Sequence, residues 1–180
     1  MNKMDEETPN DILVMGCAYT PLYGENETTL FKHGDMNNKF AETIKNLPVY
    51  IEHDTSKQVG EVMDAFINEK RQLVTLLHLA GDPFANSILP DAFFKDPFNG
   101  NKGYYNALSL GNGVGFLEEP DPSGEFTWKK IVANKPSEVS IVRAGNRPMT
   151  EINDYWILPK NAPLHEFVNE HINPFIVRYH

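Results

Sequence analysis

The apolar residues of this chain occur in short runs that proline and glycine repeatedly interrupt. The sequence holds 13 prolines and 12 glycines among its 180 residues, and 11% of the residues are aromatic. Long helices do not tolerate breakers at this frequency, whereas short strands joined by turns use them. We therefore expect a mainly β domain with several peripheral helices rather than a helical bundle.

Strand patterns are clearest in the first half of the chain. The run ILVMGCAY (12–19) is compact and apolar and ends at a turn, and VYIEH (49–53) is typical of a strand that ends on a histidine. Residues 62–80 contain two apolar runs split by the polar NEKRQ, which favours a β-hairpin. A single amphipathic helix is the alternative for that stretch.

Two further strand regions follow. Residues 116–130 contain a proline- and glycine-rich turn between two predicted strands. The stretch EVSIVRAG (138–145) alternates, so Glu138, Ser140 and Val142 should share one face of a strand.

Helical spacing appears in three places. Residues 34–47 place apolar side chains on one stripe, with Asp35 as the expected N-cap and Pro48 as the stop. A short helix is expected over 82–94, and another over 162–172.

The net charge and the cysteine content make some binding partners and cellular compartments less compatible with this chain than others. The net charge of −9 disfavours direct binding to nucleic acid or to anionic lipid, because those surfaces attract a basic field. Cys17 is the single cysteine and cannot form an internal disulfide, which favours a reducing compartment. Residues 1–10 are acidic and polar, unlike a signal peptide, and no apolar run approaches the length of a membrane span. We expect one soluble domain over residues 1–180, with 1–10 as a flexible lead-in.

The glycines of GNGVG (111–115) do not predict a phosphate-binding loop. A dinucleotide fingerprint requires a helix to begin after the glycines, and a P-loop requires a lysine. The segment FLEEPDP follows instead, so a flexible turn or a strand with bulges is the simpler interpretation.

A nucleophile is the other interpretation of this region, because Ser109 lies between two leucines just ahead of the glycines. A serine hydroxyl needs a neighbouring base at neutral pH. The chain has six histidines, namely His33, His53, His78, His165, His171 and His180. His53 is the best candidate, since it ends an apolar strand and precedes a polar segment. Sequence spacing does not establish contact between His53 and Ser109, so a purely structural histidine and serine remain the alternative.

The stretch PSEVSIVRAGNRP (136–148) ends in a polar turn, Gly145-Asn146-Arg147. Backbone N–H groups and a guanidinium gathered at such a turn could stabilise an oxyanion. An ordinary strand exit with a solvated arginine is the alternative.

The chain resembles the herpesvirus capsid maturation proteases in three stretches that occur in the same order. These stretches are LPVYIEHDTSKQVGEV (47–62), YYNALSLGN (104–112) and EVSIVRAGNR (138–147). This family, the assemblins, shares a wider clan with the bacteriophage prohead proteases, and the resemblance spans roughly residues 11–150. It implies a closed or nearly closed antiparallel β-barrel. It also implies a serine endopeptidase that needs no cofactor and no metal.

By this resemblance Ser109 is the nucleophile, His53 the general base and Glu138 the third member of the triad. Herpesvirus enzymes have a second histidine at the third position, whereas an acidic residue is known among prohead-type relatives. The oxyanion hole is expected from Gly145, Asn146 and Arg147, with the main-chain N–H of Asn146 and the side chain of Arg147 as donors.

The resemblance further implies partners and a place of action. The expected substrate is the internal scaffold or assembly protein of an immature viral capsid, and capsid shell proteins are expected partners. The chain would act inside the procapsid, in the host nucleus for a herpesvirus or in the cytoplasm for a phage. Only about thirty residues follow Pro148, fewer than in assemblins, so the homodimer of that family is an open expectation. The rival function is a noncatalytic capsid-assembly or scaffold-binding module with the same fold.

Overall fold

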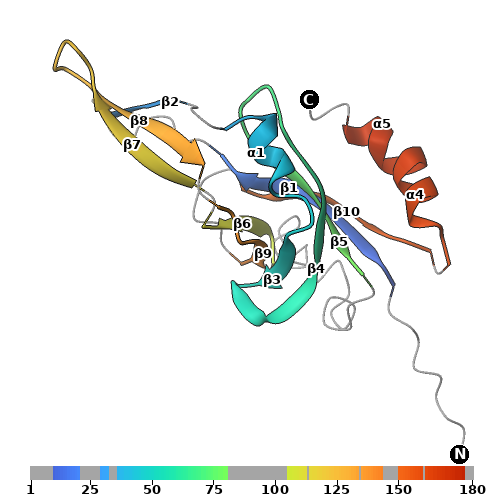
Figure 1. Ribbon diagram of the computed structural model, residues 1–180. Helices are drawn as coiled ribbons and strands as arrows, with labels where there is room; N and C mark the ends of the chain where they lie inside the picture. The colour runs from blue at the N-terminus through green and yellow to red at the C-terminus, as the bar shows by residue number, and fades with distance from the viewer. Residues whose placement is uncertain are drawn as a thin grey trace, which may run out of the picture.

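The computed structural model of the chain describes residues 10–20, 29–32, 36–80, 105–112, 114–133, 135–143, 150–159 and 161–176. Within these ranges the strands form one seven-stranded sheet, in the order β10-β1-β5-β4-β3-β9-β6, and one three-stranded sheet, in the order β2-β8-β7 (Figure 1). The strands of the larger sheet are β1 (Ile12–Tyr19), β3 (Pro48–Ile51), β4 (Asp54–Ile67), β5 (Leu73–Leu79), β6 (Ala107–Gly111), β9 (Glu138–Val142) and β10 (Ile152–Ile157). The prediction of a mainly β fold is confirmed, and the described ranges contain few helices.

Strand pairing in the larger sheet is antiparallel except between β3 and β9, which run parallel. Strand β1 forms where it was predicted, and β4 pairs with β5 as the predicted hairpin, which rules out the helical alternative for 62–80. Strand β4 begins earlier than expected, at Asp54, and β10 was not predicted.

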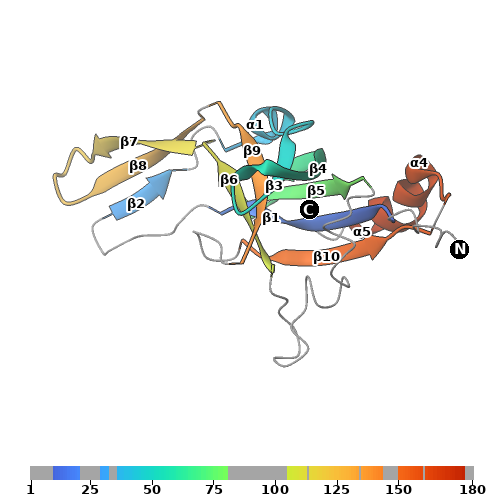
Figure 2. The same cartoon turned by 90° about the horizontal axis from the view of Figure 1, so that it is seen from below.

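The larger sheet is curled into an open half barrel (Figure 2). The closed or nearly closed barrel expected from the sequence is therefore not formed. The edge strands β6 and β10 approach each other at an isolated bridge between Ala107 and Glu151 and share no ladder. Strand β10 forms its ladder with β1, and β6 forms its ladder with β9. Beside the bridge, Leu108 N donates to Thr150 O at 3.0 Å and Ile152 N donates to Asn106 O at 2.9 Å.

The bridge depends on a close approach at Gly16 of β1. A side chain at Gly16 would place its Cβ 2.7 Å from the carbonyl oxygen of Glu151 and 2.9 Å from Leu108 Cδ1. Both contacts are shorter than real Cβ atoms allow, so glycine is required there for reasons of space.

Alternation divides the buried residues between two cores. In β1, Ile12 and Val14 pack inside the curl of the sheet, whereas Leu13 and Met15 face its outer side. The outer residues are covered by the C-terminal helices, where Ile172 is fully buried. Because β1 is buried on both faces, its sequence ILVMGCAY is a continuous apolar run and does not alternate between apolar and polar residues.

The C-terminal segment consists of α4 (Leu164–Phe167), a π-helical turn η1 (Val168–Ile172) and α5 (Asn173–Ile176). The helix predicted over 162–172 is confirmed in type, although it continues further and its middle is π-helical. Its predicted apolar stripe packs on the outer core.

The first helix is shorter than the predicted span of 34–47. Helix α1 (Asn38–Glu42) begins after Asn37, whose side-chain oxygen accepts a hydrogen bond from Phe40 N at 3.1 Å. Asp35 is therefore not the N-cap. The helix ends early because the chain turns at residues 43–46, where Asn46 adopts a φ of 67°.

The smaller sheet extends away from the larger one as an arm (Figures 1 and 2). It contains β2 (Thr29–Lys32), β7 (Val114–Pro120) and β8 (Thr127–Ala133), with β7 and β8 forming the hairpin that the turn at 121–126 predicts. Strand β2 was not predicted and pairs parallel to β8.

The described residues do not include the short helix predicted over 82–94. They also leave out residues 1–9 of the predicted lead-in. None of the helices in the described ranges has the length and apolar character that a membrane crossing requires.

Gly60 provides a test of the β4–β5 packing. A Cβ at Gly60 would overlap the carbonyl oxygen of His78 and lie 2.9 Å from Leu79 Cα. Because backbone cannot yield as a flexible side chain can, Gly60→Ala should lower the free energy of unfolding by about 1–3 kcal/mol in urea titration. Gly124→Asn is the control, since Gly124 has a φ of 74°, which Asn tolerates, and open space around it. Equal stability of Gly60→Ala and the unmodified chain would contradict this packing.

Candidate active site

Pairing of β6 with β9 brings Ser109 and Glu138 to one face of the larger sheet. Ser109 lies opposite Ser140, and Gly111 lies opposite Glu138. Directly opposed residues of antiparallel strands share a face, and so do residues two apart. Ser109 and Glu138 are therefore diagonal neighbours on one face of the sheet.

His53 reaches this face from a tight turn between β3 and β4. Strand β3 runs parallel to β9, with Tyr50 beside Ser140 and Ile51 beside Ile141. The strand ends at Ile51 rather than at the histidine, because Ile51 already pairs with Asp54 and leaves a two-residue turn. The prediction that His53 ends a strand is corrected to this extent.

Both residues of the turn have left-handed backbones, with φ of 50° for Glu52 and 60° for His53. Such a turn usually contains Asn or Gly, because other side chains are strained there. Three hydrogen bonds to the end of β9 hold it. Glu52 N donates to Ile141 O at 3.0 Å, His53 N donates to Ser140 Oγ at 3.1 Å, and Arg143 N donates to Glu52 Oε1 at 2.7 Å.

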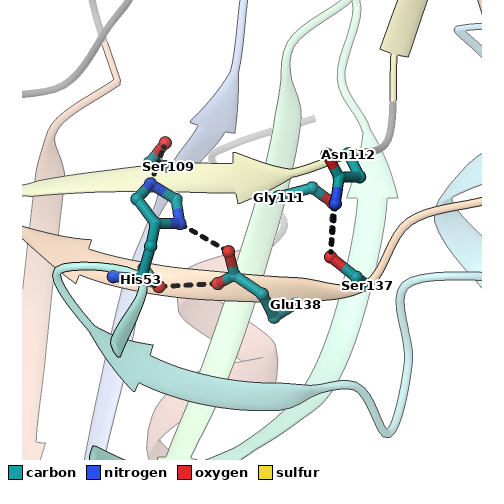
Figure 3. A network of polar contacts seen from close by, with 7 residues as sticks. His53, Ser109, Gly111, Asn112, Ser137 and Glu138 are labelled. Atoms are coloured by element: carbon teal, nitrogen blue, oxygen red, sulfur yellow. Dashed lines mark hydrogen bonds and ion pairs between the residues drawn. The ribbon is translucent and has the colours of Figure 1, made fainter. Parts of the chain in front are cut away.

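The imidazole of His53 bridges the two diagonal neighbours (Figure 3). Its Nδ1 lies 2.5 Å from Glu138 Oε1, and its Nε2 lies 3.0 Å from Ser109 Oγ. A carboxylate only accepts hydrogen bonds, so Nδ1 carries the proton and Nε2 is free to accept from the serine hydroxyl. The structure therefore brings together Ser109, His53 and Glu138, the three residues predicted as a triad.

Burial separates the roles of the three groups. Glu138 is 7% exposed and Ser109 is 8% exposed, whereas the His53 side chain is 42% exposed. The carboxylate is thus shielded from solvent, and the imidazole lies at the surface, where a bound molecule can reach it.

Ser140 is a fourth member of the network that the sequence did not identify. Its hydroxyl donates to Glu138 Oε2 at 2.6 Å while it accepts from His53 N, and the residue is fully buried. One side chain therefore fixes both the carboxylate and the turn that carries the imidazole. The alternation of EVSIV placed Ser140 on the face of Glu138, but nothing in the sequence indicated its partners.

Glu138 is also distinguished from the carboxylates that flank His53 in the sequence. Glu52 is bound by Arg143, and Asp54 accepts from Ser56 N at 3.0 Å and from Ser56 Oγ at 2.6 Å. The hydroxyl and main-chain hydrogen bonds of Ser56 hold the pKa of Asp54 below its ordinary value. Each flanking carboxylate therefore accepts hydrogen bonds from a group other than the imidazole.

The other histidines of the described chain have different surroundings. His78 Nε2 contacts Asp11 Oδ2 at 3.0 Å on β5, and the ring of His171 packs against Phe167 at a centroid distance of 4.7 Å in the C-terminal segment. His165 Nδ1 lies 3.2 Å from Asn169 Nδ2. His33 and His180 lie outside the described residues.

The predicted oxyanion residues Gly145, Asn146 and Arg147 lie outside the described residues, which stop at 143 and resume at 150. Both ends of this interval adjoin the site. Arg143 binds the carboxylate of Glu52, next to His53, and Thr150 O accepts from Leu108 N at 3.0 Å, next to Ser109.

The phosphate-loop interpretation of GNGVG has no support in the described residues. Gly111 ends β6 and Gly115 belongs to β7, so strands rather than a helix flank the glycines. In the described part of the chain, no group of three or more His, Cys, Asp or Glu side chains is arranged to hold a metal ion.

Comparison with known proteins gives matches among solved structures. No protein-family model matches the chain, and no curated protein matches it by sequence. A crystal structure of the KSHV protease with a hexapeptide phosphonate inhibitor has a TM-score of 0.48 and 16% identity, and the match covers 81% of this chain and 65% of that one. This chain thus spans less than two thirds of that protein.

The protease of Kaposi's sarcoma herpesvirus with an allosteric inhibitor matches with a TM-score of 0.48 and 13% identity, over 93% of this chain and 90% of that one. Both matched structures are herpesvirus proteases, and this chain is similar to them in structure at that TM-score.

Cys17, the single cysteine, lies in β1 and is 5% exposed, with its Sγ donating to Tyr19 O at 3.2 Å. Burial raises the pKa of the Cys17 thiol to about 12. The thiolate is therefore absent near neutral pH, and a thiolate is what nucleophilic attack requires.

This burial predicts that Cys17 is inert in the folded chain. At pH 8, iodoacetamide should alkylate the native thiol on the order of a hundredfold or more slowly than the thiol of the urea-unfolded chain. Mass spectrometry of timed samples measures both rates. Equal rates would show that the thiol is accessible and ionisable in the native state.

Proposed function

We propose that the chain is a serine endopeptidase with Ser109 as nucleophile, His53 as general base and Glu138 as the residue that orients the base. The hydrogen-bonded chain from Glu138 Oε1 through the imidazole to Ser109 Oγ is the observation that carries the proposal. Nucleophilic catalysis by serine needs this order of acid, imidazole and hydroxyl, whatever the fold.

The chemistry divides among the three side chains. Ser109 Oγ bonds to the scissile carbonyl carbon while His53 Nε2 takes the hydroxyl proton. The imidazolium then gives that proton to the leaving amine as the C–N bond breaks. Water, activated by the same imidazole, releases the acyl group and restores the serine. Glu138 holds the Nδ1 proton throughout and stabilises the imidazolium by its charge.

Gly145, Asn146 and Arg147 are proposed to supply the oxyanion hole. The described residues on either side support this proposal, because Arg143 lies beside the His53 turn and Thr150 lies beside Ser109. One well-placed donor contributes about 3 kcal/mol to stabilising a tetrahedral oxyanion.

The scaffold protein of an immature viral capsid is the proposed substrate, and the three ordered motifs around His53, Ser109 and Glu138 support this choice. Capsid shell proteins and a second copy of the chain are proposed partners, and the interior of the procapsid is the proposed place of action. The net charge of −9 fits an enzyme that acts near packaged genome without adhering to it.

Reaction with a fluorophosphonate tests the nucleophile directly. The unmodified chain should gain one phosphonyl group, located at Ser109 by peptide mapping. Ser109→Ala should gain none and should fail to cleave a co-expressed scaffold. Ser123→Ala is the matched control, because Ser123 is an exposed serine in the β7–β8 turn and should not affect labelling. An unlabelled native chain at high concentration would favour the noncatalytic assembly module instead.

The role of Glu138 is tested by Glu138→Gln, which keeps the shape of the side chain and removes its charge. The amide can donate to the imidazole and favour the wrong tautomer, so the cleavage rate should fall on the order of a hundredfold or more. Steady-state kinetics on a peptide substrate measure the change. A loss below about threefold would make Glu138 a structural residue only.

A further inference from the structure

Gly111 lies where the Glu138 carboxylate needs space. The two residues are directly opposite each other on β6 and β9. A Cβ at Gly111 would overlap Glu138 Oε1 and would lie 2.7 Å from Cδ and 2.9 Å from Cγ of the same side chain. The carboxylate thus occupies the volume that any other residue at position 111 would fill.

Backbone conformation gives no reason for glycine at this position. Gly111 is not among the residues with positive φ, and it is the next residue, Asn112, that turns the chain with a φ of 56°. Any residue could adopt the backbone of Gly111, so the absence of a side chain is the property that matters.

The main chain at Gly111 is also held in place. Its carbonyl oxygen accepts from Ser137 N at 3.0 Å and from Ser137 Oγ at 3.2 Å. Ser137 is the residue just before β9, and it lies beside Gly111 and Asn112 in Figure 3. Because β6 is fixed to the segment that leads into β9, an added methyl group would displace the carboxylate and not the strand.

We propose that Gly111 is a positioning residue for the catalytic network: by lacking a side chain, it lets the Glu138 carboxylate lie over β6 and reach His53. A displaced carboxylate would lose its contacts with His53 Nδ1 and Ser140 Oγ together, since both depend on the same position of the side chain. Gly111 and Glu138 are in this view a matched pair. The catalytic consequence rests on the proposed function.

A double-mutant cycle tests the pairing. Gly111→Ala should lower kcat on the order of a hundredfold, with KM changed less than about threefold, because the imidazole loses its orienting acceptor. In the Glu138→Ala background, where no carboxylate is present to displace, Gly111→Ala should change kcat less than about threefold. An equal loss in both backgrounds, or near-native kcat in Gly111→Ala, would overturn the proposal.

A readout that needs no activity separates this inference from the proposed function. In chain labelled with ¹⁵N-histidine, the NMR signals of His53, assigned by their loss in His53→Gln, report which ring nitrogen carries the proton. The unmodified chain should show the proton on Nδ1, and Gly111→Ala should lose this preference. That result in a chain without protease activity would uphold the pairing and refute the proposed function. An unchanged His53 spectrum in Gly111→Ala would refute the pairing, even in an active protease.

Discussion

The Glu138 carboxylate is buried, and its burial determines how the other groups of the site are arranged. A carboxylate that is 7% exposed must be compensated by hydrogen bonds, because an unpaired buried charge is costly. Its two oxygens receive one donor each, from His53 Nδ1 and from Ser140 Oγ. The need to satisfy the buried charge therefore fixes the tautomer of the imidazole, and the tautomer leaves Nε2 able to accept from Ser109.

Three strands that are distant in the sequence supply this arrangement through their register. Pairing of β6 with β9 sets Ser109 diagonal to Glu138, and the parallel pairing of β3 with β9 carries the His53 turn over the same face. A slip of one residue in either pairing would turn the side chains to the opposite face of the sheet. The buried apolar residues that alternate with the polar ones, such as Val139 and Ile141, oppose such a slip by anchoring β9 in the core.

The features that could be predicted from the sequence are those that depend on residues close together in the chain. The strands of β1 and β9 and the two hairpins follow from apolar runs, alternation and turn residues, and the three site residues follow from the ordered motifs. The left-handed turn at Glu52 and His53 could not be predicted, since tertiary hydrogen bonds to β9 override the preference for Asn-Gly. The open edge between β6 and β10 escaped prediction for the same reason, because closure is decided by contacts distant in the sequence.

A crystal structure of the chain after reaction with a phosphonate would show whether Ser109, His53 and Glu138 work together as a catalytic triad. We expect a covalent bond from phosphorus to Ser109 Oγ, with the imidazole of His53 between that oxygen and the carboxylate of Glu138. A phosphoryl oxygen should receive a hydrogen bond from the main-chain N–H of Asn146. A phosphonate on another residue, or an imidazole out of hydrogen-bonding reach of either Ser109 or Glu138, would refute the proposed triad.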